Sequence, residues 1–411
     1  MTPENLHFIG TGGAGMAPLA FLLHQRGHKI SGSDSTATAN TERLSQMGIA
    51  VHIGHAADNV PDSCGMIVFS SAIQPDNPEI QRGIALGLPA VRRGEMLAMV
   101  SRNYRRCAAV SGSHGKSSIT ALLSHIMVHT GMNPGYMVGA KVYGATDFAA
   151  GKDDDIFITE ADESDGTHTL LNPYLGIIPN FDSDHAWSVG GEAQLTANFR
   201  RFAGNSGKLL CGDTPECRKL FSDHPDVEFI SLPDKFANFF GFQAANAAIA
   251  VRAAEILGAD RSEAIASLAS FGGVARRMHI VSETPQRIVV EDYAHHPFEV
   301  KASVALLRQM FPDRHLRLVF QPHRYARLAK YFDEFAAELA KADSIIVTDV
   351  FAAWCESGSR GGRELADAIP GAVFSPGNFA DTAALASSDL PPGGVIAVLG
   401  AGTVDQVLNY L

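Results

Sequence analysis

The chain has 411 residues, a length that suggests two or three domains. Hydrophobic residues make up 46% and charged residues 19%, which indicates a packed globular protein rather than a disordered one. The net charge of −11 argues against non-specific binding to nucleic acid or to an anionic membrane, because both need a cationic face. A phosphorylated ligand stays possible, since it needs only local backbone amides and a Lys or Arg.

Targeting and cysteine patterns point to the cytoplasm as the simplest location. The sequence has no apolar run long enough for a transmembrane helix, and its start lacks a secretory pattern. The five cysteines are scattered and form no CxxC pair, so we expect neither a zinc site nor a disulfide framework. The oligomeric state stays open.

Short apolar runs alternate with helix-length segments, which predicts an α/β protein with parallel sheets. The predicted strands are Leu6–Gly10, Gly65–Ser70, Ala108–Ser111, Asp155–Glu160, Gly176–Asn180, Gly207–Cys211, Arg287–Glu291, Leu316–Phe320, Ser344–Asp349 and Gly394–Gly400. Predicted helices include Met16–Arg26, Ser117–Thr130, Ala244–Leu257 and Asp333–Lys341. Breaks near residues 101–106 and 272–278 divide the chain into three α/β domains, 1–106, 107–278 and 279–411.

The first glycine-rich loop, Gly10–Met16, follows a predicted strand and opens a predicted helix. Glycines in this position let the backbone approach a pyrophosphate at a helix N-terminus. Asp34 ends the next expected strand, where a ribose hydroxyl would lie. The loop predicts nucleotide binding; the alternative is a tight, closely packed turn. A nicotinamide-dependent oxidoreductase is a second reading of this loop, but it leaves the next loop unexplained.

The second loop, Val110–Ser118, also joins a strand to a helix. Lys116 can reach the β- and γ-phosphates of a nucleoside triphosphate, and the Ser117 hydroxyl can bind Mg²⁺. The loop is a variant, because Val110 stands where the usual phosphate loop has glycine. A lysine at a helix start is unfavourable unless an anion binds there, which favours a triphosphate site.

An acidic run, Glu160–Asp165, follows the next predicted strand. Four acids in six residues repel one another without a cation, which predicts a Mg²⁺ site beside the second loop. The alternative is a solvated acidic turn. His185, after a further strand, is predicted to assist a second metal or a phosphate.

Two motifs in the last third, Glu291–Pro297 and Phe320–Arg327, follow predicted strands at the edge where α/β sheets bind ligands. Arg324 and Arg327 are three residues apart and share one helical face. Paired arginines suit a carboxylate or phosphate, although a solvated helix start is the alternative.

The ordered motifs together resemble the Mur ligases, the ATP-dependent amide-forming ligases of peptidoglycan synthesis. The motifs that carry the resemblance are Gly10–Met16, Ser31–Asp34, Ser70–Glu79, Ala109–Ser118, Thr159–Asp165, Asn180–His185, Gly272–Met278, Glu291–Glu299, Phe320–Arg327 and Gly400–Val404. The motif Phe320–Arg327 is similar to the alanine-adding branch rather than to the branch that recycles tripeptide.

The resemblance implies a Rossmann-like N-terminal domain that binds the UDP-sugar, a P-loop ATPase-like central domain that binds ATP, and a Rossmann-like C-terminal domain that contacts the amino acid and ATP. In this chain the central domain is expected to be shortened. The implied activity is that of an ATP- and Mg²⁺-dependent ligase that joins UDP-N-acetylmuramate to L-alanine through an acyl phosphate. A ligase for another amino acid, a tripeptide or an acceptor outside peptidoglycan is the alternative, as is a non-catalytic nucleotide-sugar-binding paralogue. The implied UDP-sugar-binding residues are Gly10, Gly12, Gly13, Ala14, Gly15, Met16, Asp34, Ser70 and Ser71. The implied ATP-binding residues are Gly112, Ser113, His114, Gly115, Lys116, Ser117, Ser118, Asn246, Arg276, Asp292 and Tyr293.

The remaining implied roles concern catalysis, metal and amino acid. The implied catalytic residues are Lys116, Glu163, His185 and His295. The implied metal ligands are Ser117, Glu163 and His185, and the implied amino-acid-binding residues are His295, Arg324 and Arg327.

The sequence departs from the family pattern in three places. Ser117-Ser118 replaces the usual Thr-Thr and keeps both hydroxyls. Phe242-Gln243 replaces the usual His-Asn, and the segment between Asp213 and Asn246 is shorter than usual. The pair Phe242-Gln243 concerns adenine recognition, and the shorter segment implies that part of the central domain is missing. Two alternatives follow: a compact true ligase, or a paralogue with changed nucleotide or acceptor preference.

Overall fold

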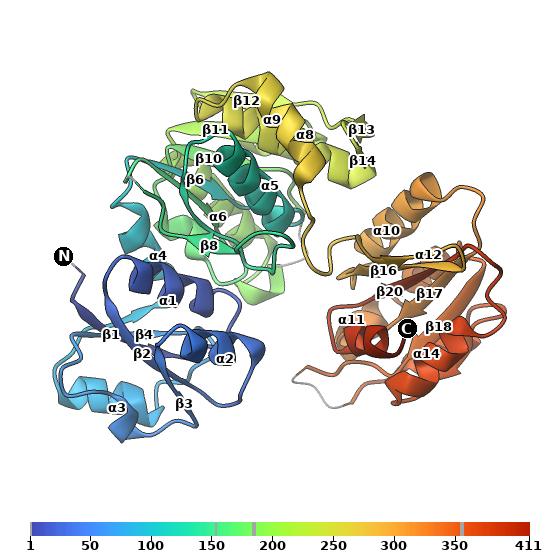
Figure 1. Ribbon diagram of the computed structural model, residues 1–411, viewed down its shortest axis with the longest axis horizontal. Coiled ribbons are helices and arrows are strands. Elements are labelled where there is room, and N and C mark those ends of the chain that lie inside the picture. Colours follow the sequence, from blue (N-terminus) through green and yellow to red (C-terminus); the bar gives the residue numbers. More distant parts are fainter. Residues whose placement is uncertain (1, 153, 183–185, 354–356) are drawn as a thin grey trace. The chain divides into compact units, whose positions relative to one another are not determined.

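A computed structural model describes residues 2–152, 154–182, 186–353 and 357–411 (Figure 1). It shows the expected α/β protein, with three large sheets. The chain divides into two compact units, one of residues 1–238 with 245–272 and one of residues 239–244 with 273–411. Within the described parts of the chain, no helix has the length and apolar character that crossing a membrane requires.

The first sheet has five parallel strands in the order β3-β2-β1-β4-β5. Its strands are β1 (Asn5–Ile9), β2 (Lys29–Asp34), β3 (Ala50–Ile53), β4 (Met66–Phe69) and β5 (Ala90–Arg92). Its helices are α1 (Met16–Gln25), α2 (Ala39–Gln46), α3 (Pro78–Ala85) and α4 (Arg93–Ser101). The buried strand β1 lies between β2 and β4, so the strand order reverses at its carboxyl end. Such a reversal opens a crevice for ligands, and Gly10 lies at it.

The second sheet has the order β12-β11-β10-β6-β9-β7-β8 and is parallel except for β8. Its strands are β6 (Arg106–Val110), β7 (Gly135–Met137), β8 (Phe148–Ala149), β9 (Ile156–Glu160), β10 (Leu175–Ile178), β11 (Lys208–Gly212) and β12 (Val227–Ile230). Its helices are α5 (Lys116–His129), α6 (Glu192–Asn205), α7 (Pro215–Phe221), α8 (Gly241–Ile256) and α9 (Arg261–Ser267). Central β6 pairs with β9 and β10, so the loops that follow these three strands meet at one edge.

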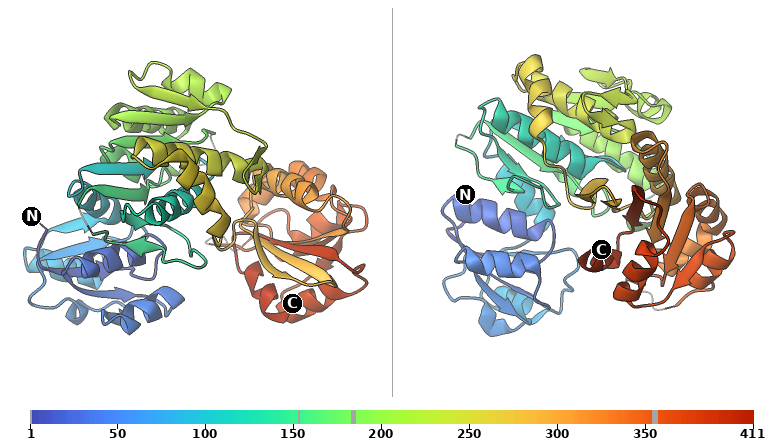
Figure 2. Two further views of the ribbon diagram at one scale, coloured as in Figure 1. Left: turned by 45° about the horizontal axis from the view of Figure 1, so that its top comes forward. Right: turned by 45° about the vertical axis from the view of Figure 1, so that its right-hand side comes forward.

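A contact between the first two sheets fixes them within one compact unit. Phe21 of α1 stacks on Phe148 of β8, with ring centroids 4.3 Å apart and planes 1° from parallel. The Arg43 guanidinium lies over both rings, and its Nη1 is 2.6 Å from an Asp147 carboxylate oxygen. Stacked rings under a paired cation resist sliding, so this contact holds the two sheets in one arrangement. Figure 2 shows α1 and the central sheet from two further sides.

The third sheet has the order β15-β16-β20-β17-β18-β19 and is parallel except for β15. Its strands are β15 (His279–Glu283), β16 (Arg287–Asp292), β17 (Leu316–Phe320), β18 (Ser344–Thr348), β19 (Val373–Ser375) and β20 (Gly394–Leu399). Its helices are α10 (Pro297–Met310), α11 (Tyr325–Lys330), α12 (Phe332–Leu339), α13 (Gly362–Asp367) and α14 (Phe379–Ser387). The fully buried β20 lies between β16 and β17, which brings together the loops that follow all three.

The ten predicted strands are confirmed, as β1, β4, β6, β9, β10, β11, β16, β17, β18 and β20. The four predicted helices are confirmed as α1, α5, α8 and α12, with small differences at their ends. Each of the three predicted domains contains one large sheet, while the domain boundaries stay a prediction.

Candidate active site

The first glycine-rich loop is held by the end of β2. Gly10 has a φ of 83°, and its N–H donates to the Ser33 carbonyl at 2.8 Å. The Gly12 N–H donates to the Asp34 carboxylate at 2.7 Å. A Cβ on Gly12 would lie 2.9 Å from the same carboxylate, so the loop needs glycine there. In this structure Asp34 supports the loop, and its contact with a ribose stays a prediction.

The other residues predicted for the UDP-sugar gather at the same sheet edge. Ser70 follows β4, and a Cβ added to Gly10 would lie 3.1 Å from the Ser70 Cβ. Gly15 precedes α1 and lies against the Arg93 side chain. The predicted residues that complete this edge are Gly13, Ala14, Met16 and Ser71. The structure therefore brings this predicted set together.

A buried carboxylate lies beneath this loop, and the sequence analysis missed it. Glu79 is fully buried and accepts hydrogen bonds from Ser33 Oγ at 2.5 Å and Asn59 Nδ2 at 2.6 Å. His7 Nε2 lies 3.4 Å away. Burial alone would raise the pKa of Glu79, but hydrogen bonds from His7, Ser33 and Asn59 lower it to about 2. Ser33 thus connects a buried anion to the loop, a link that the motif Ser70–Glu79 did not reveal.

The second loop needs its glycines for conformation and space. Gly112 has a φ of 138° and Gly115 a φ of 88°, values that favour glycine. A Cβ on Gly112 would lie 2.9 Å from Pro179 Cδ. A Cβ on Gly115 would lie 2.7 Å from the Asn246 side-chain oxygen, so buried Asn246 lies directly against the loop. This position agrees with the predicted contact of Asn246 with the nucleotide site.

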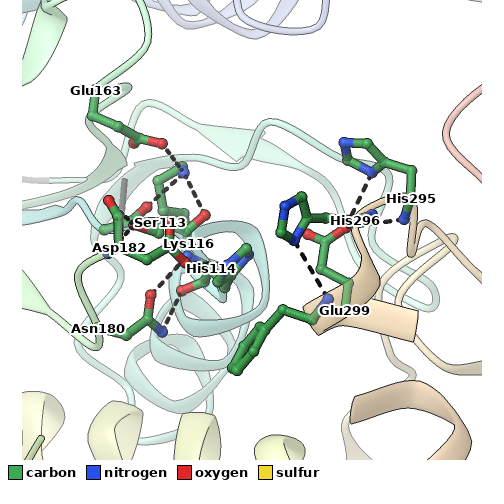
Figure 3. A network of polar contacts seen from close by, with 11 residues as sticks. Ser113, His114, Lys116, Glu163, Asn180, Asp182, His295, His296 and Glu299 are labelled. Carbon is green, nitrogen blue, oxygen red and sulfur yellow. Dashed lines mark hydrogen bonds and ion pairs between the residues drawn. The ribbon is translucent and has the colours of Figure 1, made fainter. Parts of the chain in front are cut away.

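Lys116 begins α5 and points back across the loop (Figure 3). Its Nζ donates to the Gly112 carbonyl at 2.7 Å and to Glu163 Oε1 at 2.8 Å. Burial alone would lower the pKa of Lys116, but the carboxylates of Glu163 and Asp162 raise it. The loop therefore holds a lysine that stays charged, as binding of phosphates requires.

The two nearest carboxylates divide their contacts between Lys116 and Ser117. Ser117 Oγ donates to Glu160 Oε2 at 3.0 Å, while Glu163 pairs with Lys116. Glu160 ends β9, whose register places it beside Val110 at the start of the loop. The metal ligands predicted from the sequence include Glu163 and Ser117 but not Glu160. The signal for Glu160 was its place as the first acid of the run, at the end of the strand.

The loop after β10 supports the second loop from its other side (Figure 3). The His114 N–H donates to Asn180 Oδ1 at 2.8 Å, and Asn180 Nδ2 donates back to the His114 carbonyl at 3.1 Å. The Asp182 N–H donates to Ser113 Oγ at 2.8 Å. Ser118 lies in the first turn of α5. His185 falls outside the described residues, so its role stays a prediction.

In the second unit, Arg276 and Tyr293 lie beside the predicted histidine. Arg276 Nη2 donates to the carbonyls of Gly400 at 2.5 Å and Gly402 at 3.0 Å. Its guanidinium lies 4.9 Å from the centre of the Tyr293 ring, and that ring meets His295 edge-on at 5.2 Å. The His295 N–H donates to the Glu299 carboxylate at 3.0 Å (Figure 3). The structure thus brings three of the predicted residues together.

His323 extends this group toward the two arginines. Its ring lies 5.3 Å from that of His295, and its Nδ1 is 3.4 Å from Arg327 Nη1. Burial and the nearby charges of His295, Arg324 and Arg327 lower the pKa of His323 to about 3. His323 is therefore neutral in a cationic group that suits an anion. His323 lies in the motif Phe320–Arg327, but the sequence predicted no role for it.

Asp292 is held by hydrogen bonds from three residues of the second unit. It accepts the N–H groups of Met278 at 3.2 Å and Tyr293 at 2.8 Å, and the Ser303 hydroxyl. Burial raises its pKa to about 6. The predicted contact of Asp292 with ATP stays a prediction.

The unusual pair Phe242-Gln243 lies at the start of α8. Phe242 packs against the core of the second unit, and Gln243 Nε2 is 3.4 Å from the Arg277 carbonyl. The effect of this pair on adenine recognition stays a prediction.

Family models match both ends of the chain. The Mur ligase family catalytic domain matches residues 5–105, and the Mur ligase glutamate ligase domain matches residues 276–402. A UDP-N-acetylmuramate–L-alanine ligase of Bifidobacterium longum subsp. infantis is 35% identical, covering 84% of this chain and 79% of the relative. One of Halorhodospira halophila is 33% identical, covering 98% and 91%. That alignment has 446 positions, more than the chain's 411 residues, so the relative carries segments that this chain lacks.

A solved structure supports the same architecture. The crystal structure of UDP-N-acetylmuramate–alanine ligase from Thermotoga maritima superimposes with a TM-score of 0.84 at 23% identity, covering 99% of this chain and 98% of that one. At that identity the match shows the fold alone. The family models and the relatives at 33–35% identity also show the family. The chain belongs to the Mur ligase family.

Proposed function

We propose that the protein joins L-alanine to UDP-N-acetylmuramate in an ATP-dependent reaction of peptidoglycan precursor synthesis. The observation that carries this proposal is the charged Lys116 at the head of α5, held by Glu163 beside the Ser117–Glu160 pair. The family membership and the names of the two relatives agree with it.

The chemistry explains why a phosphate-binding loop is needed. A carboxylate is a poor electrophile, so the γ-phosphoryl group of ATP is first transferred to the muramate carboxylate, giving an acyl phosphate and ADP. The alanine amine then attacks the carbonyl carbon, and phosphate leaves from the tetrahedral intermediate. Two anions meet in the first step, and Lys116 offsets their repulsion while the loop fixes their approach.

The donors beside Lys116 fit a hard cation. Ser117 offers a hydroxyl and Glu160 a carboxylate, the oxygen ligands that Mg²⁺ prefers. These two residues would hold the ion, which when bound would neutralise phosphate charge. Glu163 keeps its predicted catalytic role here by fixing the Lys116 ammonium. Its role as a metal ligand, with that of His185, stays a prediction.

The amino acid is assigned to the second unit. Arg324 and Arg327 suit its carboxylate, and neutral His323 lies between Arg327 and His295. Because the His323 imidazole is neutral, it adds no positive charge beside the attacking amine. Its ring can also accept a hydrogen bond from a donor group.

Release of ADP by the purified protein tests the proposal. Release should require Mg²⁺, UDP-N-acetylmuramate and L-alanine together, and Lys116→Ala should abolish it. Release with another amino acid or a tripeptide would instead support a related ligase. Binding of UDP-N-acetylmuramate without any ADP release would identify a non-catalytic paralogue.

A further inference from the structure

Arg93, the first residue of α4, lies between the first glycine-rich loop and the acidic segment that follows β9. Its Nη2 is 2.6 Å from Asp165 Oδ2 and 3.3 Å from Thr167 Oγ1. On its other side, Nη1 lies so close to Gly15 that an added Cβ there would be 3.0 Å away. The Arg93 and Asp165 side chains are only 17% and 20% exposed, so solvent screens their attraction less than on an open surface.

Asp165 is the last residue of the acid loop, which we define as residues 160–165. Glu163, two residues before Asp165 in the acid loop, pairs with Lys116 of the phosphate loop at 2.8 Å. Two residues of chain and one ion pair therefore link Asp165 to Lys116, the lysine that the proposed function places on ATP.

Hydrogen bonds within the acid loop hold its residues together. The N–H and Oγ of Ser164 donate to Asp162 Oδ1 at 2.9 Å and 2.8 Å. The backbone at the start of α4 also lies close to the segment after the acid loop, because a Cβ on Gly94 would lie 2.5 Å from Thr167 Oγ1. The start of α4 and the segment after the acid loop thus fit without spare room.

We propose that Arg93 is a positioning residue that couples occupancy of the Gly10–Met16 loop to the affinity of the Lys116 loop for ATP. A guanidinium has several donors in one plane, so its position can be fixed at Gly15 and at Asp165 together. A ligand that orders the first loop orders Arg93, and through Asp165 it orders the acid loop. Once the first ligand has ordered these loops, the second ligand binds without the entropic cost of ordering them. Each ligand therefore raises the affinity for the other. This inference rests on the proposed function for its two ligands.

Calorimetric titration measures the coupling directly. The Kd of a non-hydrolysable ATP analogue with Mg²⁺ is measured with and without saturating UDP-N-acetylmuramate. In the wild-type protein we expect the sugar nucleotide to tighten the analogue about 5-fold or more, within the usual range of coupled sites. In Arg93→Ala the factor should fall to about 1, while each ligand still binds alone.

Three further variants separate coupling from folding. Asp165→Asn should lose the coupling like Arg93→Ala, and Arg93→Lys should retain part of it because its charge still pairs with Asp165. Arg82→Ala is the matched control, since Arg82 pairs with Asp62 at 3.0 Å on the surface of the same sheet domain. It should keep the wild-type factor.

The inference and the proposed function fail separately. Independent binding of both ligands by a wild-type protein that releases ADP would overturn the coupling alone, as would unchanged coupling in Arg93→Ala. Failure of the wild-type protein to release ADP with all three substrates would overturn the proposed function.

Discussion

Glu160 and Glu163 are three residues apart and contact different groups of the same loop. Glu160 accepts from Ser117, and Glu163 pairs with Lys116. We expect Glu160→Gln to raise the Mg²⁺ concentration needed for half-maximal activity, because a neutral amide binds a hard cation less well. Glu163→Gln should lower kcat at saturating Mg²⁺, because it removes the ion pair with Lys116. A rise in its Mg²⁺ requirement would in addition support the predicted role of Glu163 as a metal ligand.

Mg²⁺ titrations of ADP release compare the two variants with the wild-type protein. Equal shifts in the Mg²⁺ requirement would contradict the division of roles. The sequence did not distinguish Glu160 from Glu163 for a structural reason. In a run of acids, the residue that reaches the loop depends on the β6–β9 register, which composition does not reveal.

Glu79 should give the protein a specific acid sensitivity. Its pKa is lowered from 4.5 to about 2 in the folded protein, so its contribution to stability is present above pH 4.5 and is lost as the pH falls toward 2. The shift corresponds to about 3 kcal/mol. Glu79→Gln should therefore be less stable at pH 7 and should lose less stability than the wild-type protein between pH 5 and 3.

Urea unfolding across that pH range measures this effect. Glu42→Gln is the control, because Glu42 is an exposed glutamate on α2 of the same sheet domain. If the unfolding free energies of the wild-type and Glu79→Gln proteins changed in parallel with pH, the pKa of Glu79 would not be lowered by its neighbours.

At the scale of elements, the second loop depends on space as well as conformation. Gly112→Ala places a Cβ 2.9 Å from Pro179 at a φ of 138°. Gly131→Ala is a matched control with a φ of 78° and no atom within 4 Å of the added Cβ. We expect the Gly112 variant to bind the ATP analogue at least about 10-fold more weakly, a loss of about 1.4 kcal/mol.

The Gly131 variant should lose stability by about 1 kcal/mol from backbone strain alone and keep its nucleotide affinity. Calorimetric titration and urea unfolding of both variants check this pair. Wild-type affinity in Gly112→Ala would mean that the loop shifts freely away from Pro179.

Long buried strands were predictable, whereas short or exposed strands, most of them at sheet edges, were not. Buried on both faces, β6 and β20 consist of continuous apolar runs that stand out in the sequence. The edge strand β3 has three exposed residues, and β5 and β19 have only three residues each. Their positions depend on pairing with a neighbouring strand, which single-sequence patterns do not encode.

The same reasoning explains the outcome at the sites. Glycine loops and strand-end motifs were visible because they follow apolar runs. His323 acquires its character only when β16 and β17 flank β20 and bring His295 beside it. Glu79 is far along the chain from the loop that it supports, so its role needed the folded sheet.

At the scale of the whole molecule, two compact units with separate cores should unfold separately. The core around Phe8 and Phe199 belongs to the first unit, and the core around Leu318 and Val395 belongs to the second. We expect two calorimetric transitions. UDP-N-acetylmuramate at 100 times its Kd should stabilise the first unit by about 2.7 kcal/mol.

The transition of the second unit should not shift with the sugar nucleotide alone. L-alanine serves as the control ligand, since it is assigned to the second unit. One cooperative transition that moves as a whole would contradict the division into independent units.

The clamp of Phe21, Phe148 and Arg43 on Asp147 has a consequence for substrate choice. It holds the distance between the first glycine-rich loop and Lys116 constant. If these two loops bind the diphosphate and ATP as proposed, that distance limits the length of substrate that can react. An analogue whose acid arm is one methylene longer should bind with little loss and yet yield far less ADP. Equal turnover of both analogues would show that this distance does not limit substrate length.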